Sequence, residues 1–294
     1  NINRGREPMY RYQDEVLRIM GIVLDSSDKL QDQSKAFYER HGLKFFNEYM
    51  SLPENENRPL NAITYFDINS YLEALPFSNE HKVNVYNSLK KLFDYTYKEG
   101  ITPDIMNKVI KPDVEKKKIR LIEEENYQLL KDFVTNKEND IRDRLILGLF
   151  LFTGLSRQYI ADMSSSQFVF ENGIYKLSII KNKGNKDKQQ YVILPIKTEL
   201  QLVINEYMLQ LDGKNEKIVH IEENYLSSYV STLAEKITTK KYTPTVFSNT
   251  FIIKALREGN RIWEVSGLVL ESVGNIAKLD DIIERSLRGA AIWD

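Results

Sequence analysis

The sequence predicts a mainly α-helical protein with a small antiparallel β-sheet, an α+β fold divided into two domains. Three observations support this prediction. Apolar residues recur at helical spacing through most of the chain, short β-forming runs occur around 168–194, and a charged stretch without apolar periodicity interrupts the chain at 111–119. With 294 residues and 42% apolar content, the chain can build two medium-sized cores.

The N-terminal third is predicted to be helical throughout. Apolar spacing predicts helices over 9–24 and 34–50, and Pro53 prevents the second from continuing. Asp67 is predicted to cap a short helix and Ser78 a longer one, because short polar side chains accept hydrogen bonds from the first free backbone N–H groups. Four or five helices within about 110 residues make a compact bundle.

The charged stretch KPDVEKKKI is interpreted as a linker between the two domains, since it combines a proline, a run of charges and no apolar periodicity. We therefore predict a helical domain over residues 1–112, a linker over residues 113–119 and a second domain over residues 120–294.

The second domain is predicted to combine helices with the sheet. Short runs of β-forming residues predict strands over 168–170, 175–180 and 191–194, with the turn Glu-Asn-Gly between the first two. Helical spacing predicts helices over about 140–152, 200–211 and 225–237.

A further helix is predicted to begin at Thr243, which can cap it, with Pro244 in the first turn, where a missing N–H costs nothing. Gly259 stands just past its end, and another helix follows from Ile262.

Composition excludes several kinds of site. The chain has no cysteine and three histidines, so we expect no disulfide framework, no metal site and no cofactor. The longest apolar run, Leu145–Phe152, is too short to cross a bilayer, and no signal-peptide pattern opens the chain, which indicates a cytoplasmic protein with no membrane partner. With a net charge of −1, a surface for nucleic acid would require lysines gathered on one face.

Several motifs occur in the order found in tyrosine recombinases, the phage-integrase family. Arg120–Glu124 resembles the Leu-Thr-x-Glu-Glu start of that family's second domain, and Thr153–Leu155 resembles its Thr-Gly-Leu-Arg motif. The turn KNKGNKDK is similar to its lysine hairpin, with Lys183 in the position of the catalytic lysine, and Thr243 opens a helix like its Thr-Pro-His helix. The resemblance covers about 34–281. It implies an integrase-like helical core-binding domain followed by a tyrosine-recombinase-like catalytic-fold domain.

Most catalytic slots of the family hold other residue types here. Ser156 replaces the arginine of the Thr-Gly-Leu-Arg motif, and Arg157 is displaced by one residue, about 100° around a helix. The slots of the family's histidines, second arginine and nucleophilic tyrosine hold Thr245, Ser248, Asn249, Glu271 and Asp280, or Leu279 if the register slips by one. No tyrosine follows Tyr242. The resemblance therefore implies a catalytically degenerate protein, and we expect no catalytic residues and no enzyme activity.

The same resemblance implies a surface for double-stranded DNA, because lysines, hydroxyls and amides can bind phosphates or base edges. The expected DNA-binding residues are Lys82, Lys90, Lys91, Lys116, Lys117, Lys118, Arg157, Lys181, Lys183, Lys186, Lys188, Lys240, Lys241, Thr245, Ser248 and Asn249. Simpler interpretations stay open: a solvated helix face, a charged hairpin edge that prevents aggregation, and an ion-paired arginine.

The predicted function is sequence-specific binding of double-stranded DNA without recombination, as a transcriptional repressor that maintains lysogeny of a temperate phage in the bacterial cytoplasm. This combination of fold and lost residues resembles the integrase-fold master repressors of SPβ-type phages. One alternative is an active or atypical recombinase, for which Tyr242 is the nearest tyrosine to the lost site. Another is an accessory protein whose C-terminal helix, Ile276–Trp293, binds a recombinase, a second copy of the chain or another phage protein.

Overall fold

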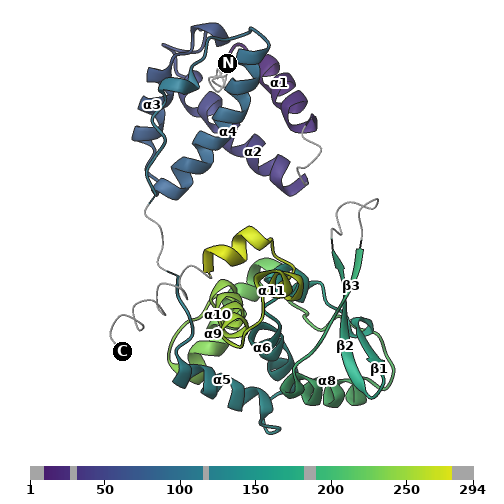
Figure 1. Ribbon diagram of the computed structural model, residues 1–294. Helices are drawn as coiled ribbons and strands as arrows, with labels where there is room; N and C mark the ends of the chain where they lie inside the picture. Colours follow the sequence, from purple (N-terminus) through teal and green to yellow (C-terminus); the bar gives the residue numbers. More distant parts are fainter. Residues whose placement is uncertain (1–9, 27–31, 115–118, 182–189, 280–294) are drawn as a thin grey trace, which may run out of the picture. The chain divides into compact units, whose positions relative to one another are not determined.

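The computed structural model describes residues 10–26, 32–114, 119–181 and 190–279 (Figure 1). The chain divides into two compact units, Asn1–Lys117 and Lys118–Asp294, and each has its own hydrophobic core. No helix among the described residues is long and apolar enough to span a membrane.

The N-terminal unit is a helical bundle. Its elements are α1 (Gln13–Asp25), α2 (Asp32–Phe45), the π-helical turn η1 (Phe46–Met50), α3 (Tyr65–Ala74) and α4 (Asn79–Lys98), with short 3-10 turns at Leu60–Ala62 and Met106–Lys108. Ser78 caps α4 as predicted and accepts a hydrogen bond from the backbone of His81. The π-helical turn was not predicted. Phe45 and Phe46, at the junction of α2 and this turn, both lie fully buried in the core.

Asp67 was predicted to be the N-cap of α3, and this prediction is wrong. The helix α3 begins earlier, with Thr64 as its N-cap, and Asp67 is the third residue of a capping box. The carboxylate of Asp67 accepts hydrogen bonds from the backbone N and the hydroxyl of Thr64, at 2.7 and 2.9 Å. It therefore fixes the start of the helix from inside the first turn.

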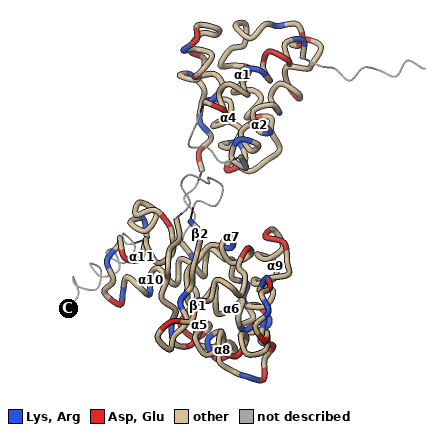
Figure 2. The backbone as a smooth tube through the Cα atoms, turned by 90° about the vertical axis from the view of Figure 1, so that its right-hand side faces the viewer, with Lys and Arg blue, Asp and Glu red and all other residues tan. Residues whose placement is uncertain are grey.

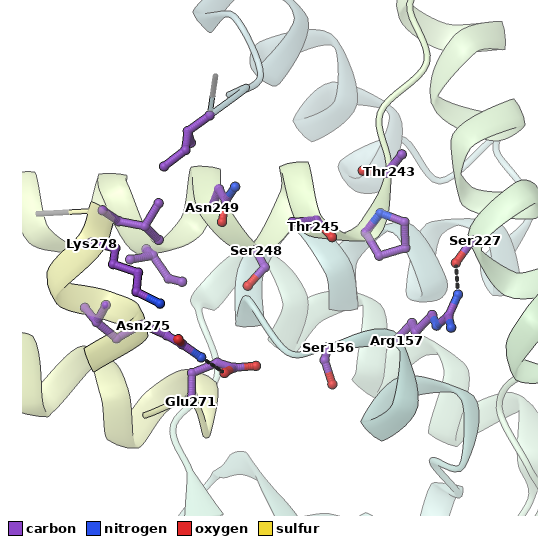
Figure 3. A pocket seen from close by; sticks show the side chains of 15 residues that line it. Ser156, Arg157, Ser227, Thr243, Thr245, Ser248, Asn249, Glu271, Asn275 and Lys278 are labelled. Carbon is purple, nitrogen blue, oxygen red and sulfur yellow. Dashed lines mark hydrogen bonds between the residues drawn. The ribbon is translucent and has the colours of Figure 1, made fainter. Parts of the chain in front are cut away.

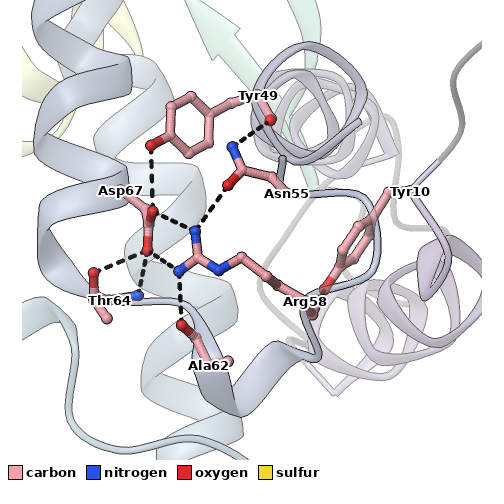
Figure 4. A network of polar contacts seen from close by, with 7 residues as sticks. All are labelled: Tyr10, Tyr49, Asn55, Arg58, Ala62, Thr64 and Asp67. Atoms are coloured by element: carbon pink, nitrogen blue, oxygen red, sulfur yellow. Dashed lines mark hydrogen bonds and ion pairs between the residues drawn. The ribbon is translucent and has the colours of Figure 1, made fainter. Parts of the chain in front are cut away.

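Asp67 is also the centre of a buried polar network (Figure 4). Both terminal nitrogens of Arg58 donate to its two carboxylate oxygens, at 2.8 and 2.7 Å, and the Tyr49 hydroxyl donates to it at 3.2 Å. Arg58 also donates to Asn55 and to the carbonyl of Ala62. Burial raises the pKa of Asp67, but the hydrogen bonds from Arg58 and Thr64 outweigh this effect and hold the pKa below its ordinary value. The network fastens the loop before α3 to the bundle.

The C-terminal unit combines helices with a three-stranded sheet. Its elements are α5 (Glu124–Thr135), α6 (Ile141–Thr153), α7 (Arg157–Ala161), a 3-10 turn (Ser165–Gln167), β1 (Phe168–Glu171), β2 (Ile174–Lys181), β3 (Gln190–Leu194), α8 (Thr198–Leu211), α9 (Glu223–Thr238), α10 (Pro244–Arg257) and α11 (Ile262–Val269). The described chain ends in further helical residues, 273–279. The mainly helical fold with a small antiparallel sheet is confirmed.

Helix α6 forms the centre of this unit. Its residues from Arg144 to Thr153 are all buried, and it packs against α5, α8 and α10 (Figure 1). The guanidinium of Arg144 is almost fully buried but satisfied, since it donates to both oxygens of Glu206 and to the carbonyl of Val134. A helix that is apolar on every side is expected at the core of a domain.

The sheet is antiparallel with the strand order β1-β2-β3. Asn172 and Gly173 both have positive φ in the turn between β1 and β2, as tight hairpin turns require. In the register, Leu177 pairs with Phe168 on one side and with Leu194 on the other, and all three are buried. These apolar residues attach one face of the sheet to the core.

We expect Asp67→Asn to destabilise the N-terminal unit by about 3 kcal/mol, because it leaves the partly buried Arg58 guanidinium without its carboxylate. Asp94→Asn, which removes the exposed partner of Lys90, is the control and should cost less than about 0.5 kcal/mol. Urea unfolding followed by circular dichroism measures both. Tryptophan fluorescence should not change, because both tryptophans lie in the other unit. Equal stability losses in the two variants would contradict the role of the network.

Candidate functional site

A pocket of about 700 Å³ opens on the C-terminal unit beside the start of α10 (Figure 3). Its polar and charged lining residues are Ser156, Arg157, Ser227, Thr243, Thr245, Ser248, Asn249, Glu271, Asn275 and Lys278. Its apolar lining residues are Ile119, Pro244, Ile252, Ile276 and Leu279. The pocket therefore collects side chains from segments more than one hundred residues apart in the sequence.

The first turns of α10 form one wall of this pocket. Pro244 is the first helical residue, and Thr243 occupies the N-cap position as predicted, but its side chain makes no capping hydrogen bond. Thr245, Ser248 and Asn249, spaced three and four residues apart on one face of the helix, project toward the pocket (Figure 3). Val246 and Phe247 donate their backbone N–H groups to the carbonyl of Thr243, and Pro244 has none. The helix dipole and the backbone N–H of Thr245 still make this wall favourable for an anion.

The opposite wall follows a left-handed turn at Gly154, which has a φ of +65°. A Cβ at Gly154 would lie 2.4 Å from the Phe251 ring and 2.8 Å from Val269, so only glycine fits there. The Ser248 hydroxyl donates to the carbonyl of Gly154 at 2.8 Å, which ties the two walls together. Its hydrogen is thus engaged within the protein, and Ser248 can offer a ligand mainly its lone pairs.

Arg157 is the first residue of α7 and reaches the pocket from the end nearest α9. Its guanidinium donates to Glu223 at 3.3 Å and to the Ser227 hydroxyl at 2.9 Å. The ion-paired arginine that the sequence left open as an alternative is therefore what the structure contains. The side chain is still 43% exposed, and a guanidinium carries five N–H donors, so this contact leaves donors for a ligand.

The far end of the pocket was not predicted as part of a binding site. Glu271 accepts a hydrogen bond from the side chain of Asn275 at 3.0 Å, and Lys278 lies near them (Figure 3). The comparison of motifs did place Glu271 in a catalytic slot, and this was the one sequence feature that could have indicated this end of the pocket. Asn275 and Lys278 follow in a helical stretch, 273–279, whose sequence carries no family motif.

Other expected residues lie outside the pocket. In the C-terminal unit, Lys240 pairs with Glu123 at 2.8 Å and Lys241 with Glu235 at 3.5 Å. Lys181 is the last residue of β2 and pairs with Gln190 in the sheet. Lys116, Lys117, Lys118, Lys183, Lys186, Lys188 and Asp280 lie outside the described residues.

Three expected lysines belong to the N-terminal unit, on α4. Lys82 donates to the carbonyl of Glu73, Lys90 pairs with Asp94, and Lys91 lies 5.5 Å from the ring centre of Tyr38. In Figure 2, basic and acidic residues are interspersed in both units. A nucleic-acid surface was predicted to require lysines gathered on one face; of these three, Lys90 has an acidic partner and Lys91 an aromatic one.

Tyr242, the tyrosine nearest to the lost slots, is buried and does not line the pocket. Its hydroxyl donates to Glu123 and accepts from Asn126. Burial, together with the Glu123 carboxylate, raises the pKa of Tyr242 to about 12. A nucleophilic tyrosine needs exposure and access to its phenolate form, and the position of Tyr242 offers neither.

Among the described residues, no group of three or more His, Asp or Glu side chains is placed to hold a metal ion.

No family model and no curated protein matches the sequence. Solved structures do share its fold. XerH site-specific recombinase bound to a palindromic difH substrate, in a post-cleavage complex, matches with a TM-score of 0.70 and 15% identity over 99% of this chain and 98% of its own. A lambda integrase dimer bound to a COC' core site matches with a TM-score of 0.65 and 14% identity over 90% and 94%. The Tn1549 transposon integrase with circular intermediate DNA gives 0.60 and 13% over 90% and 94%.

The chain therefore has the fold of the tyrosine recombinases, as its motifs predicted. The slots that the motifs assigned to Ser156, Thr245, Ser248, Asn249 and Glu271 all line the one pocket described above.

The expectation that the chain is not an enzyme is contradicted by these comparisons, because the proteins that share its fold are site-specific recombinases and integrases. That expectation considered only the residue types at individual slots. The structure brings five of those slots, from Ser156 to Glu271, together in one pocket.

We expect Gly154→Ala to destabilise the C-terminal unit more than Gly213→Ala does. Both glycines have positive φ, which costs a residue with a Cβ about 1–2 kcal/mol, but nothing lies within 4 Å of a Cβ at Gly213. The clash of a Cβ at Gly154 with Phe251 and Val269 should add roughly 1–3 kcal/mol. Urea unfolding followed by tryptophan fluorescence measures the difference. Equal losses would mean that the turn at Gly154 does not constrain the packing of α10.

Proposed function

We propose that this protein binds double-stranded DNA at a specific sequence, and that the pocket beside α10 holds a phosphate of the duplex. The observation that carries the proposal is the gathering of hydrogen-bond donors at one helix N-terminus: the backbone N–H and hydroxyl of Thr245, the Asn249 amide and the Arg157 guanidinium. XerH, lambda integrase and the Tn1549 integrase, which share the fold, were all solved with DNA.

The chemistry of the pocket suits a phosphodiester. Backbone N–H groups, hydroxyls and arginine are the groups that most often contact DNA phosphates, and a helix N-terminus adds a favourable dipole. Lys278 brings a second cation, while Glu271 brings one negative charge to the same pocket. The lining therefore carries a modest positive excess, which fits the single charge of a phosphodiester.

We also propose that both units contact the duplex. Lys82, Lys90 and Lys91 on α4 are the proposed phosphate ligands of the N-terminal unit, and Lys116, Lys117 and Lys118 are proposed to contact phosphates as well. To these we add Lys181, Lys183, Lys186, Lys188, Lys240 and Lys241. Two weak sites on one chain bind more tightly together than either alone, through effective concentration.

The proposed role of this binding is transcriptional repression in a temperate phage, carried out in the cytoplasm of its bacterial host. The resemblance to the integrase-fold repressors of SPβ-type phages supports this role. The C-terminal helix predicted over Ile276–Trp293 is the proposed contact with a second copy or another phage protein, and most of it lies outside the described residues.

The second candidate function is site-specific recombination, which the fold shared with XerH and the integrases favours. Selection of genomic fragments bound by the protein separates the two functions, because a repressor should recover promoters and a recombinase should recover paired recombination sites. Incubation of the recovered fragments as nicked suicide substrates, with a search for a covalent protein–DNA adduct, tests strand cleavage. Promoters without adducts support repression, and adducts at recombination sites would replace it.

We expect Arg157→Gln to weaken binding of the recovered duplex and to lower the log–log salt slope by up to about one, because one phosphate contact is lost. Lys214→Gln is the control, since Lys214 is exposed in the turn after α8 and does not line the pocket. Fluorescence anisotropy at several salt concentrations measures both quantities. Identical affinities and slopes for the two variants would remove Arg157 from the proposed interface.

We expect Glu223→Gln to strengthen DNA binding by about two- to fivefold, because a phosphate no longer competes with a carboxylate for the guanidinium of Arg157. Glu222→Gln is the matched control, since it changes the same charge at the neighbouring position without a hydrogen bond to Arg157 among the described residues. If both variants bind equally well, the gain reflects only the change in net charge.

A further inference from the structure

Two of the three histidines of the chain are in contact in the N-terminal unit. His41 on α2 and His81 on α4 have ring centres 4.9 Å apart and meet edge to face. Phe37 lies 4.3 Å from His41 on one side, and Phe77 lies 4.4 Å from His81 on the other. The four rings form a continuous aromatic cluster, in the order Phe37, His41, His81 and Phe77, across the contact between α2 and α4.

The imidazoles lack hydrogen-bond partners where they are buried. His41 is only 7% exposed, and its Nδ1 atom is buried without a hydrogen bond among the described residues. The Nε2 atom of His81 is likewise buried without a hydrogen bond among the described residues. A protonated imidazole has two N–H donors, and protonation would turn each of these unpaired nitrogens into a buried, unsatisfied donor on a cation.

The charges around the pair oppose a further positive charge. Burial lowers the pKa of His41 most, and His81, Arg40 and Lys44 lower it further. The Lys44 ammonium lies 4.9 Å from the ring centre of Phe77, at the edge of the same aromatic cluster. The groups that shift the pKa of His41 are all neutral or basic, and each of them lowers it.

We propose that the His41–His81 pair makes the packing of α2 against α4 sensitive to acid, so that proton uptake by this pair loosens the N-terminal unit. The inference goes beyond the proposed function and does not require that the protein binds DNA. The contact between α2 and α4 joins the two helices that hold the centre of this bundle, including the buried Phe45, Leu89 and Phe93.

The direction of the effect follows from proton linkage. Above the ordinary histidine pKa of about 6.5, both the folded and the unfolded chain carry a neutral His41, so stability does not depend on its charge. Below that pH the unfolded chain takes up the proton first, because folding lowers the pKa. The unfolding equilibrium constant of the unit should then rise by at most about tenfold per pH unit through His41, until the folded form also takes up the proton.

Hydrogen exchange of the full chain at about pH 7.5 and about pH 5.5, corrected for intrinsic exchange rates, tests the proposal. Amides of α2 and α4 should lose protection at the lower pH, whereas those of α6 should keep it. In His41→Phe, which keeps an aromatic ring but cannot take up a proton, this loss should be small. His220→Phe is the control, since His220 is exposed in the other unit, and it should behave like the unchanged chain. Unchanged protection of α2 and α4 at both pH values would overturn the proposal.

A second measurement applies if His41→Phe does not fold. The chain has three histidines, so their ring protons can be followed by NMR in the unchanged protein as the pH is lowered. His41 should titrate below the ordinary histidine pKa of about 6.5, and its titration should coincide with chemical-shift changes in α2 and α4. If His41 titrates at the ordinary histidine pKa of about 6.5, without changes in the two helices, the pair is not an acid-sensitive contact.

Discussion

The left-handed turn at Gly154 is the constraint on which the pocket of the C-terminal unit depends. It ends the central helix α6 and immediately sends Leu155 into the core and Ser156 and Arg157 toward the pocket. The close approach of Phe251 to this glycine sets how near α10 can come. The hydrogen bond from Ser248 to the Gly154 carbonyl then fixes the rotation of α10 about its axis. The backbone at Gly154 therefore sets the position of both walls of the pocket relative to each other.

Each unit uses one arginine to hold a segment that apolar packing alone would leave free. Arg58 joins the loop before α3 to that helix through Asp67, and Arg144 joins α6 to α8 through Glu206 while it binds the carbonyl that ends α5. Burying a guanidinium costs free energy unless acceptors nearby pair with its N–H groups. These arginines are thus best understood as selecting one packing arrangement among several apolar alternatives.

The conformational preferences of individual residues predicted much of the fold. The features that were not predicted depend on contacts between residues far apart in the sequence. Pro244 at the start of α10, the Asn172–Gly173 turn and the Ser78 cap follow from the conformational preferences of single residues, which a sequence displays directly. The pairing of Arg157 with Glu223 joins residues 66 positions apart, and nothing in the local pattern indicates it. The histidine contact and the π-helical turn after Phe45 likewise arise only when helices pack. The motifs located the pocket but did not predict its far end at Lys278.

The start of the C-terminal unit is fastened to its late helices rather than to its neighbours in sequence. The backbone N–H of Ile122 donates to the Thr250 hydroxyl, and Lys254 pairs with Glu124, across about 130 intervening residues. On the ribosome, the first residues of this unit must therefore wait until α10 has emerged before they can dock. The N-terminal bundle makes its contacts within its own stretch of chain and can complete its core earlier. Synthesis should thus pass through a stage in which one unit is folded while the start of the next stays exposed to chaperones and proteases.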